Sequence, residues 1–287
     1  MRILFCTDGS QISMNSLKNT SKWFCGASVD IISVIDWTFL PDEVNIEAPG
    51  FYDFCSNSAV NILDLAKEEA EKNGFKVGNT IKRCGVAVQS ILEQLDAGCY
   101  DLVLLGSHGK KGLRSWLGSV SHEITTNAKT CVYISKKENE GQKILFTVDG
   151  TKLTTQGTLE AFSLLNLEGK EIYLCMVNEE PDLLFMEGMT DTNWLLEISQ
   201  HQKDFASRAI DEARKLINAG GCNIKEAEIL TGNPAAEIIR YTKENNIDLV
   251  LMSSRYRREK KKFLNSSVCK RVLENTSADV LIAKTAG

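Results

Sequence analysis

A glycine-rich stretch that ends in serines has the composition of a loop that binds a phosphate. Its glycines are Gly106, Gly109, Gly112 and Gly118, and Ser119-Val120-Ser121 follows directly. Glycine has no Cβ and tolerates positive φ, so backbone N–H groups can approach an anion closely. If a helix opens at Gly118-Ser119, its first N–H groups and its dipole favour negative charge at that point. The residues therefore indicate anion binding by backbone amides, with the hydroxyls of Ser119 and Ser121 as further donors.

The same residues also fit an ordinary glycine-rich turn in which Ser119 caps a helix. Lys110 and Lys111 add local positive charge, and His108 could either orient a phosphate or order the loop. The other two histidines, His122 and His201, fall on expected helices without the paired spacing of a metal site. We therefore assign no catalytic residue and no metal ligand.

Short apolar runs alternate with helical patterns along the chain, which is typical of a doubly wound α/β fold. In the first half we expect strands near residues 2–6, 29–35, 77–82, 101–105 and 131–135. Helices are expected after Ser10, over about 58–73, from about 86 to 97 and after Gly118. Ligands of such sheets bind beyond the carboxyl ends of the strands, where the strand order reverses. Asp8, after the first strand, and the glycine stretch, after the fourth, are therefore the residues of interest.

The second half of the chain repeats the first. Segment 2–10 returns as 143–151, so that Asp149 matches Asp8, and segments 101–105 and 127–136 return as 248–252 and 275–284. The repeat predicts a second set of strands and a long helix from about residue 192 to Gly220-Gly221. The strands are expected near 143–147, 171–177, 224–230, 248–252 and 279–283.

The segment Lys136–Gln142 between the copies is polar, as in a short exposed linker, and the boundary falls near Asn139. We expect one domain over residues 1–137, with an intact glycine loop, and a second over 142–287, with a degenerate one. Since the linker is short, the two copies are expected to pack as a pseudo-twofold pair.

At these residues the chain resembles the universal stress protein family, whose signature is Gly-x2-Gly-x9-Gly-(Ser/Thr) after the fourth strand and an aspartate closing the first. The resemblance covers nearly the whole chain, twice. It implies two tandem five-stranded parallel sheets of order 3-2-1-4-5, the adenine nucleotide alpha hydrolase-like fold. It also implies that ATP or AMP, with or without Mg²⁺, is held by Asp8, the backbone of Val34, Gly106, Gly109, Gly118, Ser119 and Val120. Asp8 and Val34 would face the adenosine, and the others the ribose and phosphates.

Each copy departs from the family pattern in its own way. Eight residues separate Gly109 from Gly118 where the family has nine, which shortens the first loop by about 3.3–3.6 Å of chain reach and favours AMP over a triphosphate. The second copy keeps nine residues but has Ser253, Tyr256 and Ser266 in place of the three glycines. We therefore expect one nucleotide per chain, in the first copy. The basic run 255–262 in the second loop fits an anion, an acidic partner or plain solvated surface.

The resemblance favours a regulatory, stress-related protein that changes shape or partner with nucleotide occupancy. Two alternatives stay open: an interaction protein without nucleotide, and a slow ATPase or adenylyl transferase of the same broad fold. The His-x-x-His, Ser-Gly-Gly-x-Asp-Ser and Walker A motifs of such enzymes are absent. We therefore expect weak ATP hydrolysis at most.

The composition argues against some classes of binding partner. A net charge of −5 offers no global attraction to nucleic acid or anionic lipid. No apolar run approaches the roughly 18 residues of a membrane span, and the first residues lack a signal-peptide layout, so we expect a cytoplasmic protein. The nine cysteines are scattered, and Cys6, Cys131 and Cys175 are expected as small buried groups in strands. The aromatic segment Trp37–Phe54 fits a lid over the base, a homodimer contact or a surface insertion.

Overall fold

The computed structural model describes residues 1–36, 50–108, 117–179, 192–256 and 267–286. The first copy contains, in chain order, β1 Arg2–Cys6, α1 Gln11–Ser21, β2 Ser28–Ile35, α2 Phe51–Lys72, β3 Lys76–Cys84, α3 Ala87–Ala97, β4 Leu102–Gly106, α4 Ser119–Asn127 and β5 Cys131–Ser135. The second copy contains β6 Lys143–Val148, α5 Lys152–Leu164, β7 Glu171–Asn178, α6 Thr192–Ala219, β8 Ile224–Thr231, α7 Pro234–Glu244, β9 Leu249–Tyr256, α8 Ser267–Asn275 and β10 Asp279–Ala286.

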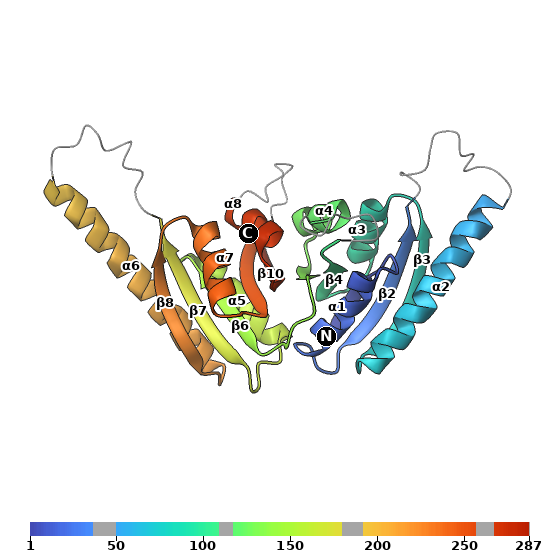
Figure 1. The fold of residues 1–287 in the computed structure, drawn as a ribbon, viewed down its shortest axis with the longest axis horizontal. Helices are drawn as coiled ribbons and strands as arrows, with labels where there is room; N and C mark the ends of the chain where they lie inside the picture. Colours follow the sequence, from blue (N-terminus) through green and yellow to red (C-terminus); the bar gives the residue numbers. More distant parts are fainter. Residues whose placement is uncertain (37–49, 109–116, 180–191, 257–266, 287) are drawn as a thin grey trace.

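Each copy has the strand order expected from the resemblance, and the two sheets merge into one. The order is β3-β2-β1-β4-β5-β10-β9-β6-β7-β8 (Figure 1). Within each copy the paired strands are parallel, whereas β5 and β10 are antiparallel. The expected fold class is therefore confirmed, with the addition that a single ten-stranded sheet runs through both copies.

The strand pair at the centre of the sheet has the symmetry that the repeat predicts. Tyr133 pairs with Leu281, and these two residues occupy equivalent positions in the two copies. On either side of them, Val132 pairs with Ile282 and Ile134 with Val280, which is the exchange a twofold rotation produces. The predicted pseudo-twofold packing is confirmed.

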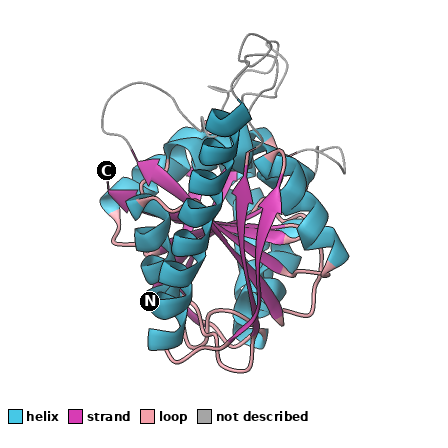
Figure 2. Ribbon diagram, turned by 90° about the vertical axis from the view of Figure 1, so that its left-hand side faces the viewer, coloured by secondary structure: helices cyan, strands magenta, loops and turns pink. Residues whose placement is uncertain are grey.

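Helices cover both faces of the sheet, as Figure 2 shows. The core on one face includes residues from α1, α2 and α6, and the core on the other includes residues from α3, α4, α7 and α8. Both cores run across the β5–β10 junction into the two copies. Since both faces are covered, the strand residues Ile3, Leu4 and Phe5 are all fully buried, which explains the continuous apolar runs of the sequence.

Helix α2 begins earlier than the sequence pattern predicted, at Phe51 instead of near residue 58. Gly50 precedes it with φ of 92°, a left-handed conformation that glycine adopts at little cost. The end of the aromatic segment, residues 51–54, therefore belongs to this helix. Residues 37–49, on which the lid and dimer interpretations depend, lie outside the described residues.

The segment between the copies is more than an exposed linker. Gly141 is buried with φ of 65°, and a Cβ added to it would lie 2.6 Å from the Cβ of Lys22. Lys170 Nζ donates to the Gly141 carbonyl at 2.6 Å. The segment is therefore partly exposed, as predicted, and is also hydrogen-bonded to the second copy, which the sequence pattern did not indicate.

Two further features of the composition have structural counterparts. Cys6, Cys131 and Cys175 are buried, as predicted, and burial raises the pKa of the Cys175 thiol to about 12. Among the helices that the structure describes, none combines the length and apolar character that crossing a bilayer requires.

Candidate functional site

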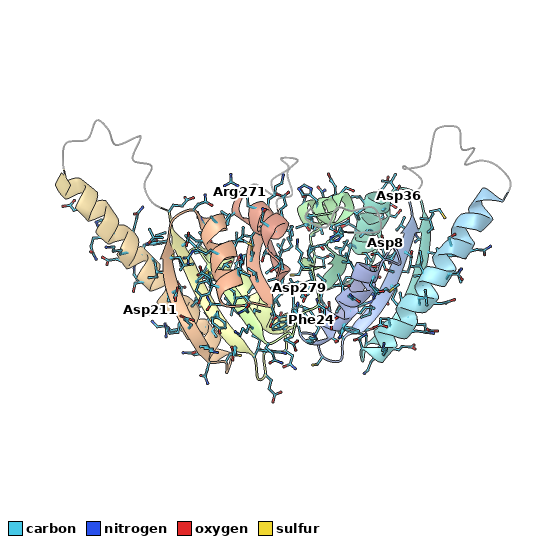
Figure 3. All side chains as sticks on the ribbon, viewed as in Figure 1. Asp8, Phe24, Asp36, Asp211, Arg271 and Asp279 are labelled. Atoms are coloured by element: carbon cyan, nitrogen blue, oxygen red, sulfur yellow. The ribbon has the colours of Figure 1, made fainter. Side chains whose placement is uncertain are left out.

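The carboxyl ends of β1, β2 and β4 lie side by side, because β1 pairs with β2 on one side and with β4 on the other. Cys6, the last residue of β1, is in register with Ile32 of β2 and Leu105 of β4. Asp8, Val34 and Gly106 are therefore at the same edge of the sheet. Figure 3 shows Asp8 and Asp36 at this edge of the first copy. This is the point where the strand order reverses and where such sheets bind ligands.

Asp8 organises the turn that leads into α1. Its Oδ1 accepts the N–H of Ser10 at 2.9 Å and lies 3.3 Å from Ser13 Oγ. Ser10 caps the helix, since its Oγ accepts the N–H of Ser13 at 3.2 Å. Between them, Gly9 has φ of 74°, and a Cβ there would lie 2.9 Å from Ile62 Cγ1, so this position needs glycine.

The second copy keeps the same turn. Asp149 Oδ1 accepts the N–H of Thr151 at 2.9 Å and its hydroxyl at 2.6 Å. Gly150 has φ of 72°, like Gly9. The aspartate turn therefore does not distinguish the two copies, as the sequence indicated.

Gly106 has a packing role that the sequence did not indicate. It is buried at the end of β4, and a Cβ added to it would lie 3.2 Å from both the Cα and the N of Ser13 in α1. In the second copy Ser253 takes this position, and the glycine is instead Gly157 on the facing helix α5. Close contact between strand and helix is thus achieved in both copies, with the small residue on opposite elements.

This exchange gives a stability prediction. In Gly157→Ala the new Cβ would lie 1.9 Å from Ser253 Oγ and 2.7 Å from Ser253 Cβ, so the helix has to move outward. We expect a loss of about 1–3 kcal/mol in unfolding free energy, as for other overpacked cores. Adding Ser253→Gly should recover most of the loss, because it restores the arrangement of the first copy. Urea unfolding of the single and double variants measures both values, and a single variant as stable as the wild type would contradict the packing role.

The two ends of the glycine loop are held together by one hydrogen bond. The N–H of Gly118 donates to the carbonyl of Ser107 at 2.7 Å. Gly118 has φ of −62° and ψ of 150°, which any residue can adopt, so the expectation that positive φ explains this glycine was wrong. Gly109 lies outside the described residues.

Helix α4 starts at this hydrogen bond and presents its first turn to the same edge. The helical ladder begins with the N–H of His122 donating to the Gly118 carbonyl at 2.9 Å. The N–H groups of Ser119, Val120 and Ser121 therefore have no acceptor within the helix. Ser119 is exposed and Val120 half-buried, so the end of the helix is accessible from this edge.

The side chains of Ser121 and His108 form hydrogen bonds within the protein. Ser121 is buried, and its Oγ donates to the Gly106 carbonyl at 2.7 Å, which corrects the expectation that it offers a donor to an anion. His108 Nδ1 lies 3.0 Å from Ser107 Oγ, in line with the loop-ordering alternative.

The end of β2 forms the third part of the candidate site, beside the Asp8 turn and the start of α4. Val34 is half-buried and packs against the core on the face of α3 and α4. Two residues later, Asp36 Oδ2 accepts the N–H of Ala87 at 3.0 Å, at the start of α3. Sequence reasoning gave Asp36 no role, because the helix it stabilises is far along the chain. The only signal was a carboxylate directly after a buried strand.

The fourth strand of the second copy continues where that of the first copy ends. β4 stops at Gly106, whereas β9 runs three residues past the equivalent Ser253, to Tyr256. The added residues are in register with Lys284, Thr285 and Ala286 of β10. Their backbone groups are therefore used in the sheet, and the edge of the second copy differs in backbone structure as well as in sequence.

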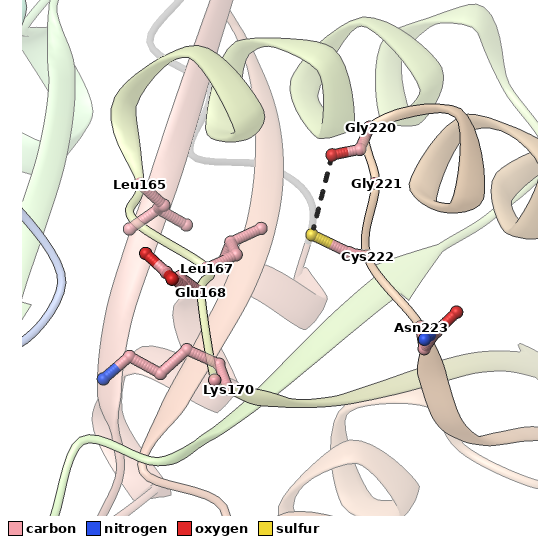
Figure 4. A pocket seen from close by; sticks show the side chains of 9 residues that line it. Leu165, Leu167, Glu168, Lys170, Gly220, Gly221, Cys222 and Asn223 are labelled. Carbon is pink, nitrogen blue, oxygen red and sulfur yellow. Dashed lines mark hydrogen bonds between the residues drawn. The ribbon is translucent and has the colours of Figure 1, made fainter.

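A cavity of about 500 Å³ lies elsewhere, between the turn from α5 to β7 and the turn from α6 to β8 (Figure 4). Leu165, Leu167, Lys170 and Cys222 are among its lining residues. These turns precede β7 and β8, so the cavity is at the amino-terminal edge of the second copy, opposite to the edge that holds Asp149. Among the residues that the structure describes, no group of three or more His, Cys, Asp or Glu side chains could hold a metal ion.

Two doubly wound modules, each with an aspartate turn after the first strand and a helix start after the fourth, define a tandem protein of the adenine nucleotide alpha hydrolase-like fold. The family model described as the universal stress protein family matches residues 1–136 and again 141–284. The chain therefore belongs to the universal stress protein family.

Relatives extend over one or both copies. Universal stress protein Slr1230 of Synechocystis is 23% identical over 307 residues, covering 97% of this chain and 98% of that protein. Universal stress protein MJ0531 of Methanocaldococcus jannaschii is 27% identical over 152 residues, 53% of this chain and 86% of its own length. The crystal structure of a universal stress protein from Archaeoglobus fulgidus has a TM-score of 0.70 at 20% identity and covers 99% of this chain and 98% of its own. The tandem arrangement is thus found in other proteins of the same fold.

Proposed function

We propose that this protein is a stress-related regulator that binds one adenine nucleotide, ATP or AMP, in its first copy. The observation that carries the proposal is the meeting of the Asp8 turn, Val34 and the first turn of α4 at the point where the strand order reverses. Occupancy would change the shape of the protein or its choice of a protein partner. A cytoplasmic location and a homodimer are part of the same proposal.

We assign a role to each site residue. The first N–H groups of α4, at Ser119 and Val120, are suited to a phosphate by charge and geometry. Gly118 keeps the approach to them open because it has no side chain. We assign Asp8 and the backbone of Val34 to the adenosine. Gly106 lets α1 pack closely beneath the site. Gly109, which lies outside the described residues, keeps the assignment to ribose and phosphates that the family resemblance implies. Mg²⁺ would accompany the phosphates of ATP.

The proposed function is nucleotide binding without efficient catalysis. We expect ATP hydrolysis far below the roughly 1 s⁻¹ that marks the low end of typical enzymes. A radiolabelled ATPase assay on the purified chain checks this. Rapid turnover that depends on Asp8 would support the slow-enzyme alternative instead.

A matched pair of aspartate variants tests the site. In Asp8→Asn the amide oxygen can still accept from Ser10, so the turn is kept while the charge is lost. We expect micromolar binding of one nucleotide in the wild type, about tenfold weaker binding in Asp8→Asn, and an unchanged value in the control Asp149→Asn. Titration calorimetry with ATP and AMP, with and without Mg²⁺, measures all three. A wild type that binds neither nucleotide would favour the interaction protein without nucleotide.

A further inference from the structure

Helix α1 extends from the candidate site to the junction between the copies, and hydrogen bonds hold it at both ends. At the site end, Ser13 Oγ lies 3.3 Å from Asp8 Oδ1 and 2.8 Å from Thr7 Oγ1. Gly106 packs directly against the backbone of Ser13. A ligand that shifts the Asp8 turn or the end of β4 would therefore also displace the start of α1.

The side of α1 that faces the protein interior carries Leu17 and four polar residues, and the polar residues are hydrogen-bonded. Ser16 Oγ donates to the Ser13 carbonyl at 2.5 Å, and Thr20 Oγ1 donates to the Ser16 carbonyl at 2.6 Å. Ser16, Asn19 and Thr20 are fully buried. The hydroxyls of α1 bond to carbonyls of the same helix, and the helix is close-packed. Because a close-packed protein interior transmits strain, we expect a displacement at one end of α1 to reach the other end.

At the junction end of α1, Asn19 contacts a carboxylate of the second copy. Asn19 Nδ2 lies 3.0 Å from Asp279 Oδ2, and it also donates to the Lys137 carbonyl at 2.8 Å. Asp279 is the first residue of β10 and is fully buried at the centre of the molecule (Figure 3).

The described donors to the Asp279 carboxylate come from the first copy and from the linker that follows it. They are Asn19 Nδ2, the Tyr133 hydroxyl at 2.7 Å, Ser135 Oγ at 3.5 Å, the N–H of Lys136 at 2.7 Å and Asn139 Nδ2 at 3.0 Å. One side chain of the second copy is therefore surrounded by α1, β5 and the linker of the first. Its position depends on how the two copies sit together.

Among the residues that the structure describes, the arrangement has no counterpart on the other side of the pseudo-twofold axis. The residue equivalent to Asp279 is Cys131, whose Sγ receives the N–H of Lys284 at 3.4 Å, just as Asp279 receives that of Lys136. The residue of α5 equivalent to Asn19 is Glu160, which is exposed. Among the described residues, α1, which starts at the Asp8 turn of the first copy, is bonded in this way to the other copy, whereas its counterpart α5 has an exposed glutamate at the same position.

We propose that α1 couples nucleotide occupancy of the first copy to the junction between the copies, through the hydrogen bond from Asn19 to Asp279. The inference rests on the proposed function and states how nucleotide binding would be transmitted to the rest of the protein. Binding at the Asp8 edge shifts α1, and the shift changes the contacts of Asp279 and the pairing of β5 with β10. If bound nucleotide changes the strength of the Asn19–Asp279 contact by some factor, then linkage requires that loss of the contact changes nucleotide affinity by that factor.

The coupling is tested with one variant at the contact and one matched control. Asn19→Ala removes the contact, and Lys136→Met removes a different junction bond, in which Lys136 Nζ donates to the Leu273 carbonyl at 2.6 Å without touching α1. We expect Asn19→Ala to change the affinity for ATP or AMP about fivefold, within the usual range of coupling, and Lys136→Met to leave it within about twofold.

Hydrogen–deuterium exchange on the wild type provides a second test that does not depend on how a variant folds. Added ATP or AMP should change protection in segments 132–139 and 279–282 as well as at residues 8–13 and 118–121. The junction change should be lost in Asn19→Ala.

The outcomes separate the two proposals. If the wild type binds nucleotide but protection at the junction is unchanged, the coupling is refuted and the proposed function stands. Equal affinity in Asn19→Ala and the wild type also refutes the coupling. If the wild type binds neither ATP nor AMP, the proposed function itself fails, and the coupling with it.

Discussion

Replacing Gly118 by valine is expected to abolish nucleotide binding, lowering affinity at least about 100-fold, while the protein stays folded. The backbone at Gly118, with φ of −62° and ψ of 150°, is one that valine readily adopts. Its N–H can still donate to the Ser107 carbonyl. The cost to folding should be about 1 kcal/mol, since valine is a poor residue before a helix.

The large effect on binding has a steric and electrostatic origin. A valine side chain at this position would stand in front of the first N–H groups of α4, where the proposed phosphate is held. Loss of those contacts by about 100-fold corresponds to roughly 2.7 kcal/mol, a value in keeping with several charge-assisted hydrogen bonds.

The matched control is Ser266→Val, at the equivalent sequence position of the second copy. We expect the wild type and Ser266→Val each to bind one nucleotide per chain, and Gly118→Val none. Titration calorimetry gives the stoichiometry, and circular dichroism with urea unfolding confirms that the variants are folded. Two equal sites in the wild type, or loss of binding in Ser266→Val, would overturn the asymmetry.

Sequence patterns located the elements of the site because these patterns are local. The apolar run Ile3-Leu4-Phe5 predicted a buried strand, and Ser10 and Gly118 marked the helix starts within a residue or two. The repeat then predicted a symmetric pair without any knowledge of the strand pairing. The order of strands in each copy followed from the family resemblance, and the structure has that order.

What the sequence could not give are contacts between residues far apart in the chain. The role of Gly106 depends on the backbone of Ser13, and that of Ser121 on the carbonyl of Gly106. Asp279 belongs to a repeated segment in which its counterpart is a cysteine, so the repeat itself gave no reason to single it out. Buried polar groups of this kind are recognised only when their donors and acceptors are brought together by the fold.

The stability of the protein relative to its Asp279→Asn variant is expected to fall as pH rises from about 4 to 7. Burial raises the pKa of Asp279 to about 6, although hydrogen bonds from Lys136, Tyr133, Asn139 and Asn19 oppose the shift. An aspartate in the unfolded chain has a pKa near 3.9. Between these values the folded chain holds a proton that the unfolded chain has released, so stability declines with rising pH. A difference of about two pKa units corresponds to about 3 kcal/mol, which is fully present below the pKa of the unfolded chain and is lost as pH rises through about 6.

Asp30 provides the opposite case within the same chain. It is also buried, but its carboxylate faces the guanidinium of Arg2 at 2.6 Å and the N–H of Asn79 at 2.9 Å. Burial raises the pKa of Asp30, and the bonds from Asn79, Arg2 and Tyr100 outweigh this, so that its pKa is lowered. The contribution of Asp30 is therefore present above the pKa of the unfolded chain and is lost as pH falls, so the difference between wild type and Asp30→Asn should increase with pH. Urea unfolding of the wild type and both variants from about pH 2 to 7 covers the two windows: the Asp30 difference changes mainly below about pH 5 and the Asp279 difference mainly between about pH 4 and 7. If the stability difference between wild type and Asp279→Asn also rose with pH, the pKa of Asp279 would be lowered in the folded chain. The hydrogen-bond donors would then outweigh the effect of burial on that pKa, and the prediction would be wrong.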